Sequence, residues 1–210
     1  MFVLRSIIVG ALMQLYSQFI FSELSSKESL RFQYTMEQGF DTSCGMSVVA
    51  TALDRYWGMP TDEVELIEIT IGEKLQDRDY TVSLADMAKA FESRGVAARA
   101  FKLDWEGLQS LVAKGYAPVV VHYAEPEKHF ALLLGFKDGR AITVDPARGL
   151  ESLSRESFEA RYSGAAMALA SKTLKPEAAL VADAVATAGK KQSRLEESAA
   201  RTAKLSGRSW

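Results

Sequence analysis

The chain divides into a first half with apolar residues at helical spacing and a second half with short β-branched runs. The strongest helical pattern begins at Cys44, after which apolar residues recur at i, i+3, i+4, i+7, i+10 and i+11, the spacing of one buried helix face. These residues are Met46, Val49, Ala50, Leu53, Tyr56 and Trp57. Gly58 and Pro60 follow and predict the end of this helix.

Three more helices are predicted, each by a side chain that can cap its first turn. They cover residues 61–69, 83–94 and 104–114, with Thr61, Ser83 and Asp104 as the caps. Asp86 lies three residues after Ser83, as in a capping box. The polar residues 72–81 are predicted to form a loop.

Strands dominate the second half, in runs rich in β-branched and apolar residues. The runs are 117–123, 129–135, 141–145 and 165–170, and an earlier alternating run at 96–103 predicts one more strand. Asp138-Gly139 is a strong hairpin signal, so the runs that carry His129 and Asp145 should pair. A short helix capped by Ser154 is expected over 154–162. Helices first and sheet second predict an α+β domain, with N-terminal helices packed on an antiparallel sheet.

The two ends of the chain differ from the middle. Residues 1–24 place one positive charge, Arg5, before an apolar run, the layout of a secretory signal; an uncleaved anchor and an ordinary buried helix are the alternatives. Residues 25–37 predict a polar linker with a short strand at 30–34. Residues 173–210 are rich in Ala, Lys, Glu and Arg, and predict a surface helix followed from Gly189 by a poorly ordered tail. The folded domain is therefore expected over residues 25–172.

The composition indicates one domain of ordinary size. The chain has 210 residues, of which 48% are hydrophobic and 25% charged, and a formal net charge of −2. This balance gives no basic surface for nucleic acid, so nucleic acid is not an expected partner. The single cysteine excludes an internal disulfide, and no CxxC or Cys/His cluster offers a zinc site. We therefore predict no metal and no other cofactor.

Cys44 is the candidate nucleophile. It lies at the start of a predicted helix, where unpaired N–H groups and the positive end of the helix dipole favour a thiolate. The alternative is a small buried hydrophobic residue, as many free cysteines are. A reactive thiolate also needs an imidazole within hydrogen-bond reach.

The two histidines are unequal candidates for that imidazole. His129 begins a strand just after a polar turn, a position from which its side chain can face a cleft. His122 lies inside the preceding strand, between Val121 and Tyr123, where a hydrogen-bonded structural histidine is the simpler interpretation. The position in the chain therefore favours His129.

Two further residues complete a candidate site. Asp145 ends the strand predicted to pair with the His129 strand, so it can orient the imidazole across the hairpin; the alternative is that it only caps a turn. Gln38, six residues before Cys44, can supply a side-chain amide for an oxyanion, together with a backbone N–H. Gly45 is expected to leave room for a substrate backbone.

These motifs together resemble one known family. The run Gln38-x-x-Asp41-x-Ser43-Cys44-Gly45, then His129-Phe130 and Asp145-Pro146, resembles the C39 cysteine peptidases, papain-like domains that remove double-glycine leader peptides from bacteriocins and related secreted peptides. The resemblance covers roughly residues 31–171. It implies a papain-like fold with Cys44 as nucleophile, His129 as base, Asp145 as orienting acid and Gln38 at the oxyanion. It also implies a peptide or protein substrate and a secretion-machinery partner.

The sequence departs from the family pattern at two points. The best-known members are N-terminal domains of peptide-exporting ABC transporters, whereas this sequence has no nucleotide-binding motif and begins with an export-type segment. It is more similar to stand-alone exported members, some of which accompany secretion of biofilm amyloid. Ser43 also replaces the usual acid before the cysteine, with Asp41 two residues earlier.

The sequence therefore predicts a periplasmic cysteine endopeptidase that cleaves a secreted peptide or protein after a double-glycine leader. Membrane contact is expected only through residues 1–24, if they are not cleaved. A non-catalytic C39-like module that binds a leader or a partner without cutting it is the alternative. Acyl transfer other than hydrolysis would use the same residues.

Overall fold

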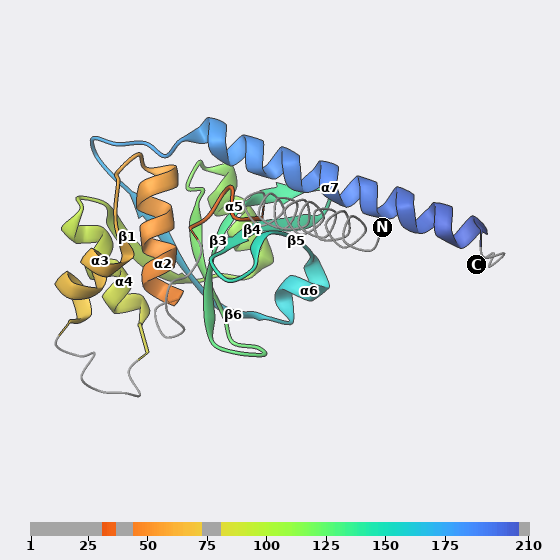
Figure 1. Cartoon of the computed structure of the whole chain (residues 1–210). Helices are drawn as coiled ribbons and strands as arrows, with labels where there is room; N and C mark the ends of the chain where they lie inside the picture. Colours follow the sequence, from red (N-terminus) through yellow and green to blue (C-terminus); the bar gives the residue numbers. More distant parts are fainter. Residues whose placement is uncertain (1–30, 37–43, 73–80, 206–210) are drawn as a thin grey trace, which may run out of the picture.

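The computed structural model describes residues 31–36, 44–72 and 81–205 (Figure 1). The helical part comprises α2 (Cys44–Thr51), which continues as the π-helix η1 (Ala52–Tyr56), then α3 (Glu63–Ile71), α4 (Leu84–Ser93) and α5 (Trp105–Ala113). The strands are β1 (Ala97–Lys102), β2 (Val119–Tyr123), β3 (His129–Lys137), β4 (Arg140–Asp145), β5 (Gly149–Ser154) and β6 (Tyr162–Ala170). Two helices flank β6: α6 (Arg155–Glu159) and α7 (Ala178–Leu205). Residues 1–24 and Gln38 lie outside the described residues.

The six strands form one sheet in the order β1-β6-β2-β3-β4-β5, and all neighbouring strands are antiparallel. β2 to β5 follow one another along the chain, whereas β6 returns to lie between β1 and β2. The β3–β4 turn has positive φ at both Asp138 (52°) and Gly139 (71°), the geometry for which Asp-Gly is favoured. The α+β class, the antiparallel sheet and this hairpin are confirmed.

The sheet has a buried core on each face. Alternate residues of β3 divide between the two cores because successive side chains of a strand point to opposite faces. Phe130, Leu132 and Leu134 pack in the core that contains α2, whereas Ala131 and Leu133 pack with residues of α5 and α6. The sheet is therefore the middle layer between two groups of helices.

The helix that begins at Cys44 is the central helix of the larger core. The six apolar residues that predicted it are at most 5% exposed. Gly45 is a glycine for a packing reason, since a Cβ there would approach Val82 Cγ1 to 2.5 Å. The expected space for a substrate backbone at Gly45 is thus filled by Val82 of the same chain.

Several element boundaries differ from the prediction. Asp62, not Thr61, caps α3: its side chain accepts from Val64 N, while the Thr61 hydroxyl donates to the Met59 carbonyl. The helix capped by Ser154 ends at Glu159, and β6 begins at Tyr162.

β5 was not predicted, because it is a polar strand at the sheet edge. Residues 32–34 form a turn rather than the end of a strand, closed by Thr35 N donating to Phe32 O.

The C-terminal helix α7 is longer and better packed than predicted. It continues through Gly189 to Leu205, so the prediction of a poorly ordered tail from Gly189 is wrong up to that point. Gly189 lies within the helix and does not end it, and its neighbour there is the flexible Lys137 side chain. Ala184 and Ala188 are buried in the larger core. The far half of α7 projects beyond the sheet (Figure 1).

No helix in the described ranges is both long enough and apolar enough to cross a membrane.

Candidate active site

His129 and Asp145 meet as the sequence predicted. His129 Nε2 lies 2.8 Å from Asp145 Oδ1. The Asp145 side chain is fully buried and that of His129 is 14% exposed. A charge-assisted hydrogen bond of this kind is short and strong, and burial of the carboxylate protects it from competition by water.

A β-bulge in β3 places the two residues on the same face. Near the turn Gly135 faces Ile142, but further along Leu133 faces Thr143, so Leu134 is an extra residue in β3. In the shifted register Asp145 falls opposite Ala131 and shares a face with His129. Without the bulge Asp145 would fall opposite Leu132, on the other face, because a one-residue slip exchanges the faces of a strand.

The turn after Asp145 holds the carboxylate in place. Asp145 Oδ1 also accepts hydrogen bonds from Ala147 N at 2.8 Å and Arg148 N at 3.2 Å. The Arg31 side chain binds the carbonyls of Ala147 and Arg148 at 2.9 and 3.0 Å. Asp145 therefore does cap a turn, and the same oxygen binds the histidine. Sequence reasoning missed Arg31, which lies more than a hundred residues away along the chain.

The bond to Asp145 fixes the orientation of the His129 ring. A carboxylate accepts, so Nε2 carries the hydrogen and donates it. Nδ1 is then the basic nitrogen, the atom able to take a proton from a thiol. The ring is thus held in the tautomer that a general base requires.

His122 has the structural role predicted for it. Its Nδ1 lies 2.9 Å from Ser163 Oγ, and its ring packs against Phe130 with centroids 4.8 Å apart. Burial lowers the pKa of His122, and the charges of Lys128 and His129 lower it further. This histidine is therefore held neutral and bonded to a neighbouring strand, away from Asp145.

Cys44 is the first residue of α2. The start of α2 and the start of β3, where His129 lies, are at the same end of the domain, the lower end in Figure 1. The two elements pack against each other, and the N-terminal end of α2 carries the positive end of its dipole. The Cys44 side chain and Gln38 lie outside the part of the chain that the structure describes.

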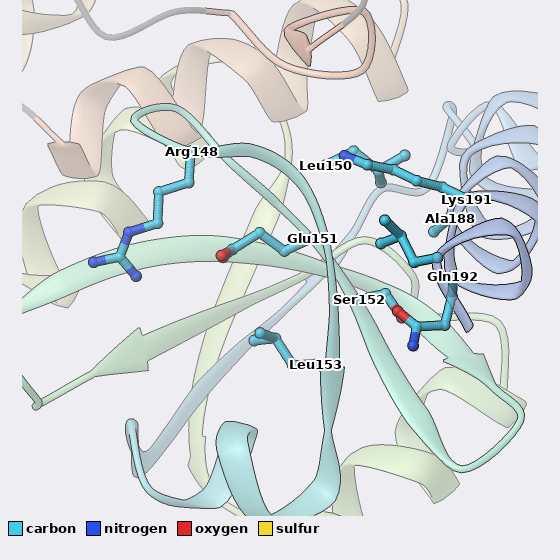
Figure 2. Close-up of a pocket in the computed structure, with 9 residues that line it drawn as sticks. Arg148, Leu150, Glu151, Ser152, Leu153, Ala188, Lys191 and Gln192 are labelled. Carbon is cyan, nitrogen blue, oxygen red and sulfur yellow. The ribbon is translucent and has the colours of Figure 1, made fainter. Parts of the chain in front are cut away.

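A separate pocket of about 310 Å³ lies between β5 and α7 (Figure 2). Polar side chains line it from both elements, including Glu151 and Ser152 from β5 and Lys191 and Gln192 from α7. Neither His129 nor Asp145 is among its lining residues. The pocket therefore does not contain the histidine–aspartate pair, although Arg148, whose N–H donates to Asp145, is one of its lining residues.

The arrangement defines a class of protein. A cysteine at the start of the central helix and a histidine–aspartate pair on the sheet, in that chain order and on an α+β fold, are the features of a papain-like cysteine peptidase. A family model described as the Peptidase C39 family matches residues 32–173. The chain belongs to this family, which confirms the resemblance found in the sequence.

Individual relatives agree with this assignment. A "Probable functional amyloid protease FapD" from Pseudomonas fluorescens is 30% identical over 152 residues, which cover 71% of this chain. The match spans 66% of that relative's length, just under two thirds.

Solved structures support the fold. The peptidase domain of Streptococcus ComA, described as a bi-functional ABC transporter of a quorum sensing pathway, superposes with a TM-score of 0.57 at 22% identity, covering 66% of this chain and 99% of that domain. A double glycine motif protease from an AMS/PCAT transporter, solved with its leader peptide, gives 0.52 at 24% identity, covering 64% and 89%. The predicted papain-like fold is thereby confirmed.

Proposed function

We propose that this chain is a cysteine endopeptidase in which Cys44, His129 and Asp145 form the catalytic triad. The observation that carries the proposal is the 2.8 Å bond between His129 Nε2 and the buried Asp145. It leaves Nδ1 as the base at the end of the domain where α2 begins. Membership of the C39 family supports the same roles.

The reaction follows from these roles. His129 Nδ1 takes the thiol proton, and the Cys44 sulfur forms a bond to the peptide carbonyl carbon while the carbonyl electrons move onto oxygen. The Cys44 N–H and the Gln38 amide stabilise that oxyanion. The C–N bond then breaks, and His129 gives its proton to the leaving amine. Water, deprotonated by His129, attacks the thioester and releases the acid and the thiol.

Asp145 contributes through His129. Its negative charge stabilises the imidazolium that exists while the thiolate is present, and its hydrogen bond keeps Nδ1 on the nucleophile's side. Because the carboxylate is fully buried, this charge acts with little screening by solvent.

The proposed substrate is a secreted peptide or protein cleaved after a double-glycine leader, in connection with a secretion or functional amyloid export system. Support comes from the Pseudomonas relative, a probable functional amyloid protease, and from the leader peptide bound to the double glycine motif protease. We place the protein in the periplasm on the basis of the signal-like pattern of residues 1–24.

The test compares exported proteins from cells that make the wild-type chain with those from cells that make Cys44→Ala. The expected result is that a precursor cut in wild-type cells stays uncut in the variant, with the N-termini read by mass spectrometry. His129→Ala should give the same uncut precursor. His122→Ala is the matched control: it removes the chain's other histidine, which bonds Ser163, and should leave cleavage in place.

Unchanged processing with Cys44→Ala would overturn the proposal. A different result would identify a non-catalytic binding module. In that case the precursor binds the wild-type chain and Cys44→Ala equally, and neither protein cleaves it.

A further inference from the structure

Four buried oxygen atoms without hydrogen-bond partners lie behind the His129–Asp145 pair. Within the described residues they are Tyr123 Oη, Thr143 Oγ1, Asp145 Oδ2 and Glu151 Oε2. Buried polar atoms in folded proteins nearly always have a partner, because an unsatisfied one loses its hydration and gains nothing in return. Four such atoms in neighbouring strands therefore call for a shared explanation.

The strand register brings these residues to one place. Thr143 and Asp145 alternate along β4 and so share a face, and Glu151 lies opposite Thr143 on β5. Tyr123 lies opposite His129 on the other side of β3. Ala131, the β3 residue opposite Asp145, carries only a methyl group over which the long Tyr123 side chain can extend.

The hydrogen bonds of Asp145 are unevenly distributed. Oδ1 accepts from His129, Ala147 and Arg148, whereas Oδ2 accepts from none. An ionised carboxylate has about two acceptor sites on each oxygen. Oδ2 therefore needs donors, and the hydroxyls of Tyr123 and Thr143 are the candidates among these four side chains.

Tyr123 is held in its protonated, donating form. Burial is the largest effect and raises the pKa of Tyr123. The Thr143 hydroxyl lowers this pKa, the charges of Glu151 and Asp145 raise it, and Arg161 lowers it slightly. Thr143 thus lies near the phenol, although the two hydroxyls do not meet hydrogen-bond geometry. These are the charged and polar groups around the Tyr123 hydroxyl.

Four unpartnered atoms of this kind match the bonding capacity of one water molecule. Water accepts two hydrogen bonds and donates two, and buried waters usually make about three bonds to otherwise unsatisfied groups. The two hydroxyls supply the donors, and Asp145 Oδ2 and Glu151 Oε2 supply the acceptors.

We propose that Tyr123 and Thr143 are positioning residues of the active site, whose hydroxyls hold Asp145 Oδ2 through one shared buried water. The proposal rests on the proposed function of Cys44, His129 and Asp145. By holding Oδ2, the network prevents the carboxylate from rotating and keeps Oδ1 on His129. The imidazolium, and with it the Cys44 thiolate, is thereby stabilised.

The test measures the rate at which iodoacetamide alkylates Cys44 as a function of pH in the full chain. Because Cys44 is the only cysteine, the rate reports one thiol. Tyr123→Phe removes the hydroxyl and keeps the ring that packs on Phe158. We expect it to raise the apparent pKa of Cys44 by about one unit and to slow alkylation at pH 6 about tenfold, as for the loss of a hydrogen bond to a charged group.

Tyr162→Phe is the matched control. Its hydroxyl is also buried without a partner among the described residues, its ring also packs on Phe158, and Tyr162 lies opposite Tyr123 on β6. The charge nearby that affects its pKa is Asp104, not Asp145. Its alkylation profile should match that of the wild type.

Thr143 gives a second, independent pair of variants. Thr143→Val keeps the shape and removes the hydroxyl, so it should shift the profile in the same direction as Tyr123→Phe. Thr143→Ser restores a hydroxyl and should restore the wild-type profile. If Tyr123→Phe does not fold, as judged by circular dichroism, the Thr143 pair decides.

The outcomes separate the two proposals. A wild-type thiol that titrates near 8.5, like free cysteine, would overturn the proposed function itself. A perturbed wild-type profile that Tyr123→Phe and Thr143→Val leave unchanged would overturn only the positioning role. A shift of equal size in Tyr162→Phe would also overturn it, since the effect would then be a general loss of packing.

Discussion

Asp145 serves both a turn and a histidine through one oxygen, and mutation can separate these two roles. Asp145→Asn keeps an oxygen that accepts from Ala147 N and Arg148 N but removes the charge that is proposed to stabilise a His129 imidazolium. We expect the folded protein to persist with kcat about tenfold lower, because the amide oxygen still accepts a hydrogen bond from His129 and only the contribution of the charge is lost.

Asp145→Ala removes the acceptor altogether. His129 and the two backbone N–H groups then lose their partner in a buried site, so we expect a loss of about 3 kcal/mol in the free energy of unfolding and about a hundredfold in kcat. Urea unfolding and peptide cleavage assays measure the two effects. Equal loss of stability in Asp145→Asn and Asp145→Ala would contradict this separation.

Residue type alone did not predict which residue caps α3. Thr61 and Asp62 are both good N-caps, so sequence alone does not choose between them. In the structure the Thr61 hydroxyl is already bonded to the Met59 carbonyl, and Asp62 takes the role. The conformation of the chain between Gly58 and Thr61 therefore decides that Asp62 is the N-cap.

Packing against Val82 explains the glycine next to Cys44, the proposed nucleophile. Gly45 on α2 lies against Val82, just before α4, and any side chain at Gly45 must displace it. We expect Gly45→Ala to lower the free energy of unfolding by about 1–3 kcal/mol through overpacking. Val82→Ala removes the closest methyl group, Cγ1. The double variant should therefore lose less unfolding free energy than the two single variants lose in total.

Denaturant unfolding of the four proteins in this double-mutant cycle measures the coupling, expected to be about 1 kcal/mol. Additive effects would show that Gly45 is needed for another reason, such as the approach of a substrate. Cys44 alkylation serves as the control that the start of α2 remains intact.

The β3–β4 hairpin and strand β5 show which features the sequence pattern predicts and which it does not. The Asp138-Gly139 turn was predictable because only residues that tolerate positive φ fit it. The bulge at Leu134 was not, because Leu133, Leu134 and Gly135 form a continuous apolar run in either register. β5 was missed because it is an edge strand whose sequence, Gly-Leu-Glu-Ser-Leu-Ser, has too few apolar and β-branched residues for the strand pattern.

The whole molecule includes more of the chain than the family match. The match ends at residue 173, yet Ala184 and Ala188 of α7 are buried in the core, and Tyr34 Oη donates to Asp183 Oδ2 at 2.6 Å and lies 3.1 Å from Thr187 Oγ1. The first half of α7 is therefore part of the folded domain.

A chain that stops after Thr173 should lose at least about 3 kcal/mol of unfolding free energy, because it loses this buried surface and the bonds to Tyr34. A chain that stops after Lys191 keeps both and should change by less than about 1 kcal/mol. Thermal unfolding of the two truncations and the full chain provides the comparison. Equal stability of the two truncations would show that α7 adds nothing to the core.

The sequence by itself determined the residues of the proposed site: one cysteine at a helix start, two unequal histidines, an aspartate at the end of a hairpin strand, and the order of these residues. These features follow from local rules, since helix periodicity, capping and turn conformation depend on residues close together in the chain. Only the tertiary structure decided that His129 and Asp145 share a face, that Arg31 holds the turn beside them, and that α7 completes the core. Those outcomes depend on strand register and on packing between distant segments. Both are determined by contacts throughout the folded chain, not by neighbouring residues.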